Sequence, residues 1–510
     1  MRIRMEIVLL VLVLAIGAFY WNVALSTPIV FGDEGWYAAM AKYMISDGMI
    51  PKWNVVHSTD IFHFTFARPP LFSMLNIAAL LMGGEFMLKL LLPLPIVLSA
   101  FMLFLLLRRL GKPVAGLIAA GALLLLPGIV TYGVMNYVET LAILFFTSSL
   151  YFADGAFRKG NKVETALSGI FAGLALLTDS SAFLLLPILV GYALFLRPMR
   201  FRQLLIVLVI AAVFLFPWIA HNVFYYGGHC LPLLPDVPGS CAPVFDIKLN
   251  ETGPAEPPSA AQGGSSVNIA GMGLLSYSLF AFGWTAAALL IFGIVTLFTP
   301  GKERLLIGLW IIVFFMVTFW QANLGRAEDA VRATLFGFPA LAAAAGLFAS
   351  SAYDWLAAKG RWISIGLVAL ILLALLPYGY EKLVTMQSVK HGLDGLIDGC
   401  NWVKANTPED SLIFAIYEHN VAWQCDRYAT SSVPDRSAIR LTDVNTSYSH
   451  LKAHGFDYIM IEQFTIAEGP TDQTPAQFVN MLESSPQQFK KVYDNTGKWG
   501  QAGVRVFQVL

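Results

Sequence analysis

The chain has 510 residues, of which 57% are hydrophobic and 13% charged, and its mean hydropathy is +0.65. A soluble domain has about 25% charged residues, so this composition excludes a soluble enzyme and a disordered chain. Basic and acidic residues balance at 33 each, which leaves no basic surface for nucleic acid. Most of the chain is therefore expected to lie in lipid.

Apolar stretches along the chain predict membrane-spanning helices. The first, at residues 7–25, follows Arg2 and Arg4 and has no small-residue cleavage site, which predicts a retained helix with a cytoplasmic N-terminus. A shorter apolar segment at 69–82 is more typical of a re-entrant or interfacial helix. Further spans are predicted at 88–107, 114–132, 138–156, 165–178, 182–196, 203–224, 272–298, 305–322, 333–350 and 362–379, which makes eleven in all.

The distribution of Lys and Arg orients these spans. Each predicted inner loop carries at least two of them, whereas the outer loops carry few for their length, as the positive-inside rule requires. An odd number of spans then places the C-terminus outside. The sequence thus predicts a multi-pass cell-membrane protein with a transmembrane domain over 1–379, outer loops at 26–68 and 225–271, and an extracytoplasmic soluble domain over 380–510.

The pattern of the last 130 residues predicts an α/β unit. Strand-like runs at 411–416, 458–462 and 505–510 are separated by helical patterns near 392–405, 442–454 and 475–484. The fold class predicted for the whole chain is accordingly a polytopic α-helical membrane protein with a C-terminal extracytoplasmic α/β domain.

All four cysteines lie on the predicted outer side of the membrane, where disulfides persist. Cys230 and Cys241 fall in one outer loop, and Cys400 and Cys425 fall in the C-terminal domain. The local pairings Cys230–Cys241 and Cys400–Cys425 are the candidates, and four free thiols are the alternative.

Charged residues next to the membrane are costly and are therefore candidates for function. Five polar clusters fall at outer boundaries, and they contain Asp33-Glu34, Arg68, Glu139, Asp179 and Arg332. Asp33 and Glu34 open a predicted interfacial helix, where a helix cap is the alternative role. Arg68 precedes two prolines, and its guanidinium matches phosphate oxygens, with a snorkelling arginine as the alternative. Together these clusters predict a site at the outer membrane boundary.

Three motifs resemble a known family. Asp33-Glu34-x-x-Tyr37, Arg68-Pro69-Pro70-Leu71 and the pair Arg108-Arg109 resemble the GT-C superfamily of membrane glycosyltransferases. Within it, the chain is most similar to the protein O-mannosyltransferase and lipid A aminoarabinose transferase group, over roughly residues 1–350. The resemblance implies a GT-C-like fold, a polyprenyl- or dolichyl-phosphate sugar as donor, and chemistry at the outer face.

The resemblance also implies roles for single residues. Asp33 would be the catalytic base on the acceptor hydroxyl and Glu34 the adjoining acid. Arg68 and Arg332 would bind the donor phosphate. Tyr37, Glu139 and Asp179 would contact substrate, although Asp179 stands where many relatives have a lysine that faces the phosphate.

The predicted reaction is direct displacement with inversion at the sugar carbon. A retaining route would need a second carboxylate as nucleophile, for which Glu34 and Glu139 are candidates. No metal or other cofactor is expected, and a metal site built from His57, His63, His221 and His229 is the weaker alternative. The acceptor is a glycan, a lipid or a protein, and a transporter or flippase of polyprenyl-linked sugars is the alternative function.

Overall fold

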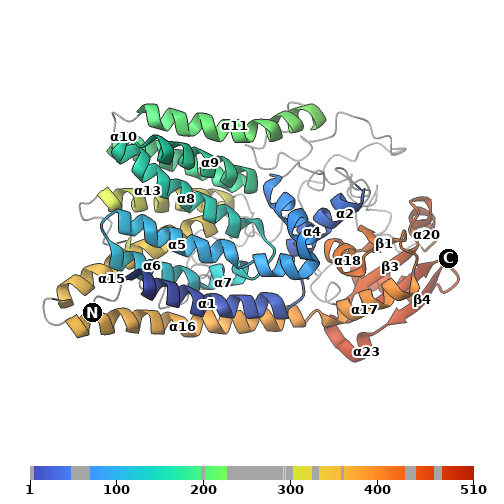
Figure 1. Ribbon diagram of the computed structural model, residues 1–510. Helices are drawn as coiled ribbons and strands as arrows, with labels where there is room; N and C mark the ends of the chain where they lie inside the picture. The colour runs from blue at the N-terminus through green and yellow to red at the C-terminus, as the bar shows by residue number, and fades with distance from the viewer. Residues whose placement is uncertain are drawn as a thin grey trace.

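The computed structural model describes residues 5–30, 32–47, 69–196, 201–226, 302–323, 334–357, 361–430, 444–463 and 474–510, together with positions 291, 293, 294 and 332. It consists of a long bundle of helices with a five-stranded sheet beyond one end (Figure 1). The described part of the chain is mostly helical, and apolar helices make it an integral membrane protein.

The main helices run side by side along the long axis of the bundle (Figure 1). They are α1 (Met5–Ser26), α5 (Leu94–Arg109), α6 (Pro113–Leu125), α8 (Val138–Lys159), α9 (Lys162–Thr178), α10 (Leu185–Leu196), α11 (Phe201–Tyr226), α13 (Lys302–Asn323), α15 (Phe338–Ala357) and α16 (Arg361–His391). Short helices connect them: α7 (Pro127–Gly133), η2 (Ser180–Leu184) and η5 (Leu335–Gly337). Local signals set the boundaries, since Gly160 ends α8 with φ +70° and the Asn161 side chain caps α9.

By length and composition, five of the described helices can cross a membrane, or six if the bent pair α6–α7 counts as one span. Three shorter apolar helices lie at 11–26, 180–194 and 304–314. The predicted span 272–298 falls almost wholly outside the described residues, so the number eleven stays a prediction.

The predicted span at 114–132 is broken in the structure. Helices α6 and α7 meet at a 64° bend, because Leu126 precedes Pro127 and is extended, with ψ 126°. A residue before proline is driven out of the helical region, and the proline itself starts the next helix.

Two helices pack across the end of the bundle next to the sheet, α2 (Asp33–Asp47) and α4 (Leu71–Leu91) (Figure 1). The apolar segment predicted at 69–82 forms the first part of α4, because the backbone is not helical at Gly83 and Gly84, and a second helical part follows as far as Leu91. The next helix starts at Leu94 rather than at the predicted residue 88, after Pro93. Helix α4 is also one of the five helices long and apolar enough to cross a membrane, so its interfacial location stays a prediction.

The C-terminal unit is a mixed sheet with helices against it. Strands β1 (Leu412–Ala415), β2 (Tyr428–Thr430), β3 (Tyr458–Glu462), β4 (Phe489–Asp494) and β5 (Val504–Val509) stand in the order β2-β1-β3-β5-β4. The pairs β1–β2 and β1–β3 are parallel, and β3–β5 and β4–β5 are antiparallel. The helices are α17 (Asp394–Asn406), α18 (Glu418–Cys425), α20 (Val444–Ala453), α22 (Thr474–Glu483), α23 (Thr496–Trp499) and η6 (Gly500–Ala502).

The predicted strands and helices of this unit coincide with β1, β3, β5, α17, α20 and α22. Strands β2 and β4 and helix α18 were not predicted, because β2 has three residues and the outer face of β4 is charged. The predicted boundary at residue 380 lies inside α16, which continues to His391.

A second hydrophobic core joins α2 to the C-terminal unit. Trp36, Met40 and Tyr43 of α2 pack in one cluster with residues of α17 and α18, among them Leu396 and Val421. This shared core is separate from the core of the bundle. The start of α2 therefore lies where the bundle and the C-terminal unit meet.

A disulfide joins α17 to α18 through Cys400 and Cys425, which confirms that predicted pairing. Cys230 and Cys241 lie outside the described residues.

Replacing Cys400 and Cys425 with serine is expected to lower the stability of this unit by about 3 kcal/mol, because the unfolded chain loses a loop closure over 25 residues. The midpoint of thermal unfolding of the whole chain measures this effect and should fall. Reducing the disulfide of the wild-type protein should lower the midpoint by the same amount. An unchanged midpoint would contradict it.

Candidate active site

The motif around Asp33 folds into a turn and a helix start that leave no room for side chains at its glycines. Gly32 has φ +51°, and a Cβ built on it would lie 2.3 Å from the Tyr137 hydroxyl. A Cβ on Gly35 would lie 2.4 Å from the side-chain oxygen of Asn420. Asp33 and Glu34 between them are the first residues of α2, where acidic side chains suit the helix dipole.

Asp33, Arg332 and Glu139 form one charged cluster. The Arg332 Nη1 atom lies 2.7 Å from Asp33 Oδ2, and Arg332 Nε donates to Glu139 Oε1. The side chain of Glu139 is 1% exposed, whereas those of Arg332 and Asp33 are 19% and 28% exposed. Asp33, the predicted base, and Arg332, a predicted phosphate ligand, therefore form an ion pair, and both side chains are partly exposed to solvent.

The surroundings of Arg332 and Tyr137 hold both side chains in the protonated form. Burial by itself would lower the pKa of Arg332. The nearby carboxylates of Glu139 and Asp33 raise it by more than burial lowers it, so the pKa lies well above its ordinary value. Burial and the charge of Asp33 raise the pKa of Tyr137. The Tyr137 hydroxyl accepts the backbone N–H of Asp33 at 3.1 Å, and its ring lies under the Arg332 guanidinium.

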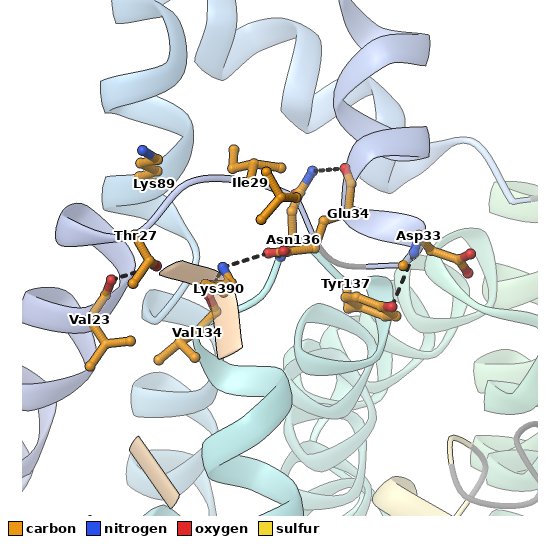
Figure 2. Close-up of polar contacts among 12 residues, drawn as sticks. Val23, Thr27, Ile29, Asp33, Glu34, Lys89, Val134, Asn136, Tyr137 and Lys390 are labelled. Atoms are coloured by element: carbon orange, nitrogen blue, oxygen red, sulfur yellow. Dashed lines mark hydrogen bonds and ion pairs between the residues drawn. The ribbon is translucent and has the colours of Figure 1, made fainter. Parts of the chain in front are cut away.

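Glu34 points the other way, into a buried ion pair. Its Oε1 atom lies 2.9 Å from Lys390 Nζ and 2.9 Å from the backbone nitrogen of Asn136 (Figure 2). The side chains of Glu34 and Lys390 are 0% and 1% exposed. Lys390 was not predicted from the sequence, because nothing local links the end of α16 to the start of α2.

Three side chains of the C-terminal unit hold the segment that precedes α2. Tyr417 accepts the Gly32 N–H at 2.7 Å and donates to the Val30 carbonyl. Asn420 donates to the Gly32 carbonyl at 3.0 Å, and Gln424 donates to that of Ile29 at 2.7 Å. No sequence motif points to these three residues, because they bond to backbone atoms of a distant segment.

Two further predicted site residues, Tyr37 and Asp179, lie near this cluster. Tyr37 is 4% exposed and packs edge-to-face on Trp36 and Phe72. Asp179 caps η2 by accepting the Ser181 N–H at 2.6 Å, and its charge acts on Glu139. Arg68 lies outside the described residues, immediately before Pro69.

Among the described residues, no group of three or more His, Cys, Asp or Glu side chains is arranged to hold a metal ion. Of the four histidines in the alternative metal hypothesis, only His221 lies in the described part of the chain, where its Nδ1 atom contacts the side chain of Asn222.

Replacing Gly35 with alanine is expected to push α18 away from α2 and to destabilise the protein by about 1–3 kcal/mol, the usual effect of overpacking. Thermal unfolding of the purified protein measures this. Gly497→Ala is the control, because no heavy atom lies within 4 Å of a Cβ built there. Equal midpoints for the two variants would contradict the close approach of α18.

A family model for dolichyl-phosphate-mannose-protein mannosyltransferase matches residues 67–221. The matched segment includes Arg68, Glu139 and Asp179, but not Asp33, Glu34 or Arg332. No curated protein matches the sequence.

Solved structures match most of the chain at low sequence identity. ArnT from Cupriavidus metallidurans, bound to undecaprenyl phosphate, is 14% identical with a TM-score of 0.66, over 98% of this chain and 97% of that one. The archaeal oligosaccharyltransferase AglB from Archaeoglobus fulgidus, with an inhibitory peptide and a dolichol-phosphate, is 14% identical with a TM-score of 0.62, over 90% of this chain and 70% of that one. The arabinofuranosyltransferase AftD from Mycobacteria is 15% identical with a TM-score of 0.53, over 98% of this chain and 40% of that one.

These structural likenesses establish a shared fold, and the family match adds sequence similarity over part of it. The resemblance to the GT-C superfamily of membrane glycosyltransferases that the motifs predict is therefore confirmed.

Proposed function

We propose that the chain is a glycosyltransferase that moves a sugar from a polyprenyl- or dolichyl-phosphate donor to an acceptor hydroxyl at the outer membrane face. The observation that carries the proposal is the contact of Arg332 with both Asp33 and Glu139 at the end of the bundle. This contact places a partly exposed carboxylate beside a cation. Transfer of a sugar from a phosphate leaving group requires both charges, one to accept the proton and one to stabilise the phosphate. The lipid phosphates bound to ArnT and AglB are of the kind that such a donor would release once its sugar has been transferred.

In the proposed reaction the acceptor oxygen attacks the anomeric carbon while the bond from that carbon to the phosphate oxygen breaks. The Asp33 carboxylate takes the hydroxyl proton, and Arg332 donates N–H groups to the phosphate as its charge grows. An arginine has five N–H donors, and the bonds described to Asp33 and Glu139 use two of them, which leaves donors for phosphate. A single displacement inverts the configuration of the sugar carbon.

Burial of the other two acids supports inversion. A retaining route needs a carboxylate next to the sugar that can form a covalent intermediate. Glu34 and Glu139 are 0% and 1% exposed, and each contacts a cation. Asp33, at 28% exposed, is the acid of these three that a substrate can reach.

The charge of the cluster bears on donor binding. Asp33, Glu139 and Asp179 are three acids around one described cation, Arg332. A phosphate needs more positive charge than Arg332 supplies, and Arg68 is proposed as the second phosphate ligand. Asp179 is proposed to face sugar or acceptor hydroxyls rather than the phosphate.

Reconstitution tests the function. Purified protein in vesicles with a labelled polyprenyl-phosphate sugar and extracts of native membrane acceptors should release labelled product in which the sugar carbon is inverted. Labelled lipid that crosses the bilayer without forming product would overturn the proposal in favour of a flippase. Since the acceptor is a glycan, a lipid or a protein, the product should be analysed in all three fractions.

A further inference from the structure

We propose that Lys390 is a positioning residue of the active site, which fixes the first turn of α2, and thereby Asp33, through its ion pair with Glu34. The proposal rests on the function proposed above, because it assigns Asp33 as the base. It also gives Glu34 a positioning role in place of a catalytic one. Lys390 itself has no route to substrate, since its side chain is 1% exposed.

Lysine is almost never fully buried unless it is paired. Lys390 Nζ lies 2.9 Å from Glu34 Oε1 and 3.2 Å from the Val134 carbonyl oxygen. The ammonium group is thus held by one charge and one backbone dipole from two different segments. It also lies in the last turn of α16, where the helix dipole favours a cation.

The same Glu34 oxygen extends the pair to the segment before α8. It accepts the backbone N–H of Asn136 at 2.9 Å, and the Asn136 side chain donates to the Glu34 carbonyl at 3.3 Å (Figure 2). The next residue, Tyr137, accepts the backbone N–H of Asp33. A chain of contacts therefore leads from Lys390 to the backbone of Asp33, the proposed base. It passes through Glu34, Asn136 and Tyr137.

The position of Lys390 in the chain gives this contact a wider role. Only Gly392 and Leu393 separate α16 from α17, the first helix of the C-terminal unit. Tyr417 and Asn420 of that unit bond to the backbone of Gly32, on the other side of Asp33. The segment around the base is thus held on one side by the end of α16 and on the other by Tyr417 and Asn420, which gives the C-terminal unit a positioning role in the site.

The test variant is the double substitution Glu34→Gln with Lys390→Met. Removing both charges leaves no unpaired buried ion, so the fold should persist where a single substitution can fail. A misplaced catalytic group costs about 100-fold in rate. We expect kcat for sugar transfer to fall by about that factor, whereas KM for the labelled donor should change less than about threefold, because Arg332 is untouched.

The control is Arg427→Met, another buried cation, which bonds only within the C-terminal unit to Thr407, Lys404 and Asp426 among the described residues. It should lower the thermal midpoint without changing kcat. A double variant whose kcat stays within about threefold of wild type, in a preparation whose wild type transfers sugar, would overturn the positioning role. A wild type that transfers no sugar would instead overturn the proposed function.

Discussion

Asp33→Asn is expected to reduce kcat for sugar transfer by about a thousandfold, within the range of about 10²–10⁴ that a general base contributes. The amide keeps the shape of the side chain but cannot accept the proton of the acceptor hydroxyl. Folding should be nearly unaffected, because a partly exposed ion pair such as Asp33–Arg332 contributes only about 0–1 kcal/mol. The rate of labelled product formation at saturating donor measures the effect.

The matched control is Asp354→Asn, which makes the same chemical change at an exposed residue of α15 that lies outside the cluster. It should transfer sugar at the wild-type rate. A rate for Asp33→Asn within about threefold of wild type, with a normal thermal midpoint, would remove Asp33 as the base.

Arg332→Gln is expected to lower the transfer rate by about 10²–10³-fold, the usual effect of removing a group that stabilises developing negative charge. KM for the lipid-linked donor should rise more than KM for the acceptor, because the guanidinium is proposed to hold the phosphate. The substitution also strands the buried Glu139 carboxylate, which costs about 3–5 kcal/mol of stability.

The two effects of Arg332 can be separated with a second variant. In Arg332→Gln combined with Glu139→Gln no buried charge lacks a partner, so the thermal midpoint should recover while the rate stays low. Recovery of the wild-type rate as well would mean that Arg332 serves only as the counter-ion of Glu139. Arg158→Gln is the control, since this half-exposed arginine pairs with Asp154 within α8, away from Asp33.

The elements that were predicted correctly are those whose signal is local. Helices α8 and α11, both long and apolar enough to cross a membrane, lie where runs of apolar residues predict spans. The pairing of Cys400 with Cys425 follows from two cysteines in one small unit. The predictions that failed concern boundaries set by single residues. Pro127 splits one predicted span, and the helix predicted to start at residue 88 starts at Leu94, after Pro93.

Part of the site was also predictable. Asp33, Glu139 and Arg332 were chosen because each is charged at a predicted membrane boundary, where charge is costly. The cost of charge at a membrane boundary indicates which residues belong to a site but not which of them pair. Glu34 and Asp33 are neighbours in the sequence, yet their side chains contact different cations.

The sequence by itself determined that this chain is a membrane protein and that its motifs resemble the GT-C superfamily, because composition and short motifs are properties of neighbouring residues. Only the tertiary structure decided which charges meet. Arg332 reaches Asp33 across 299 residues and Lys390 reaches Glu34 across 356. Such pairs depend on how whole helices pack at the end of the bundle, and buried charges must find partners wherever that packing places them.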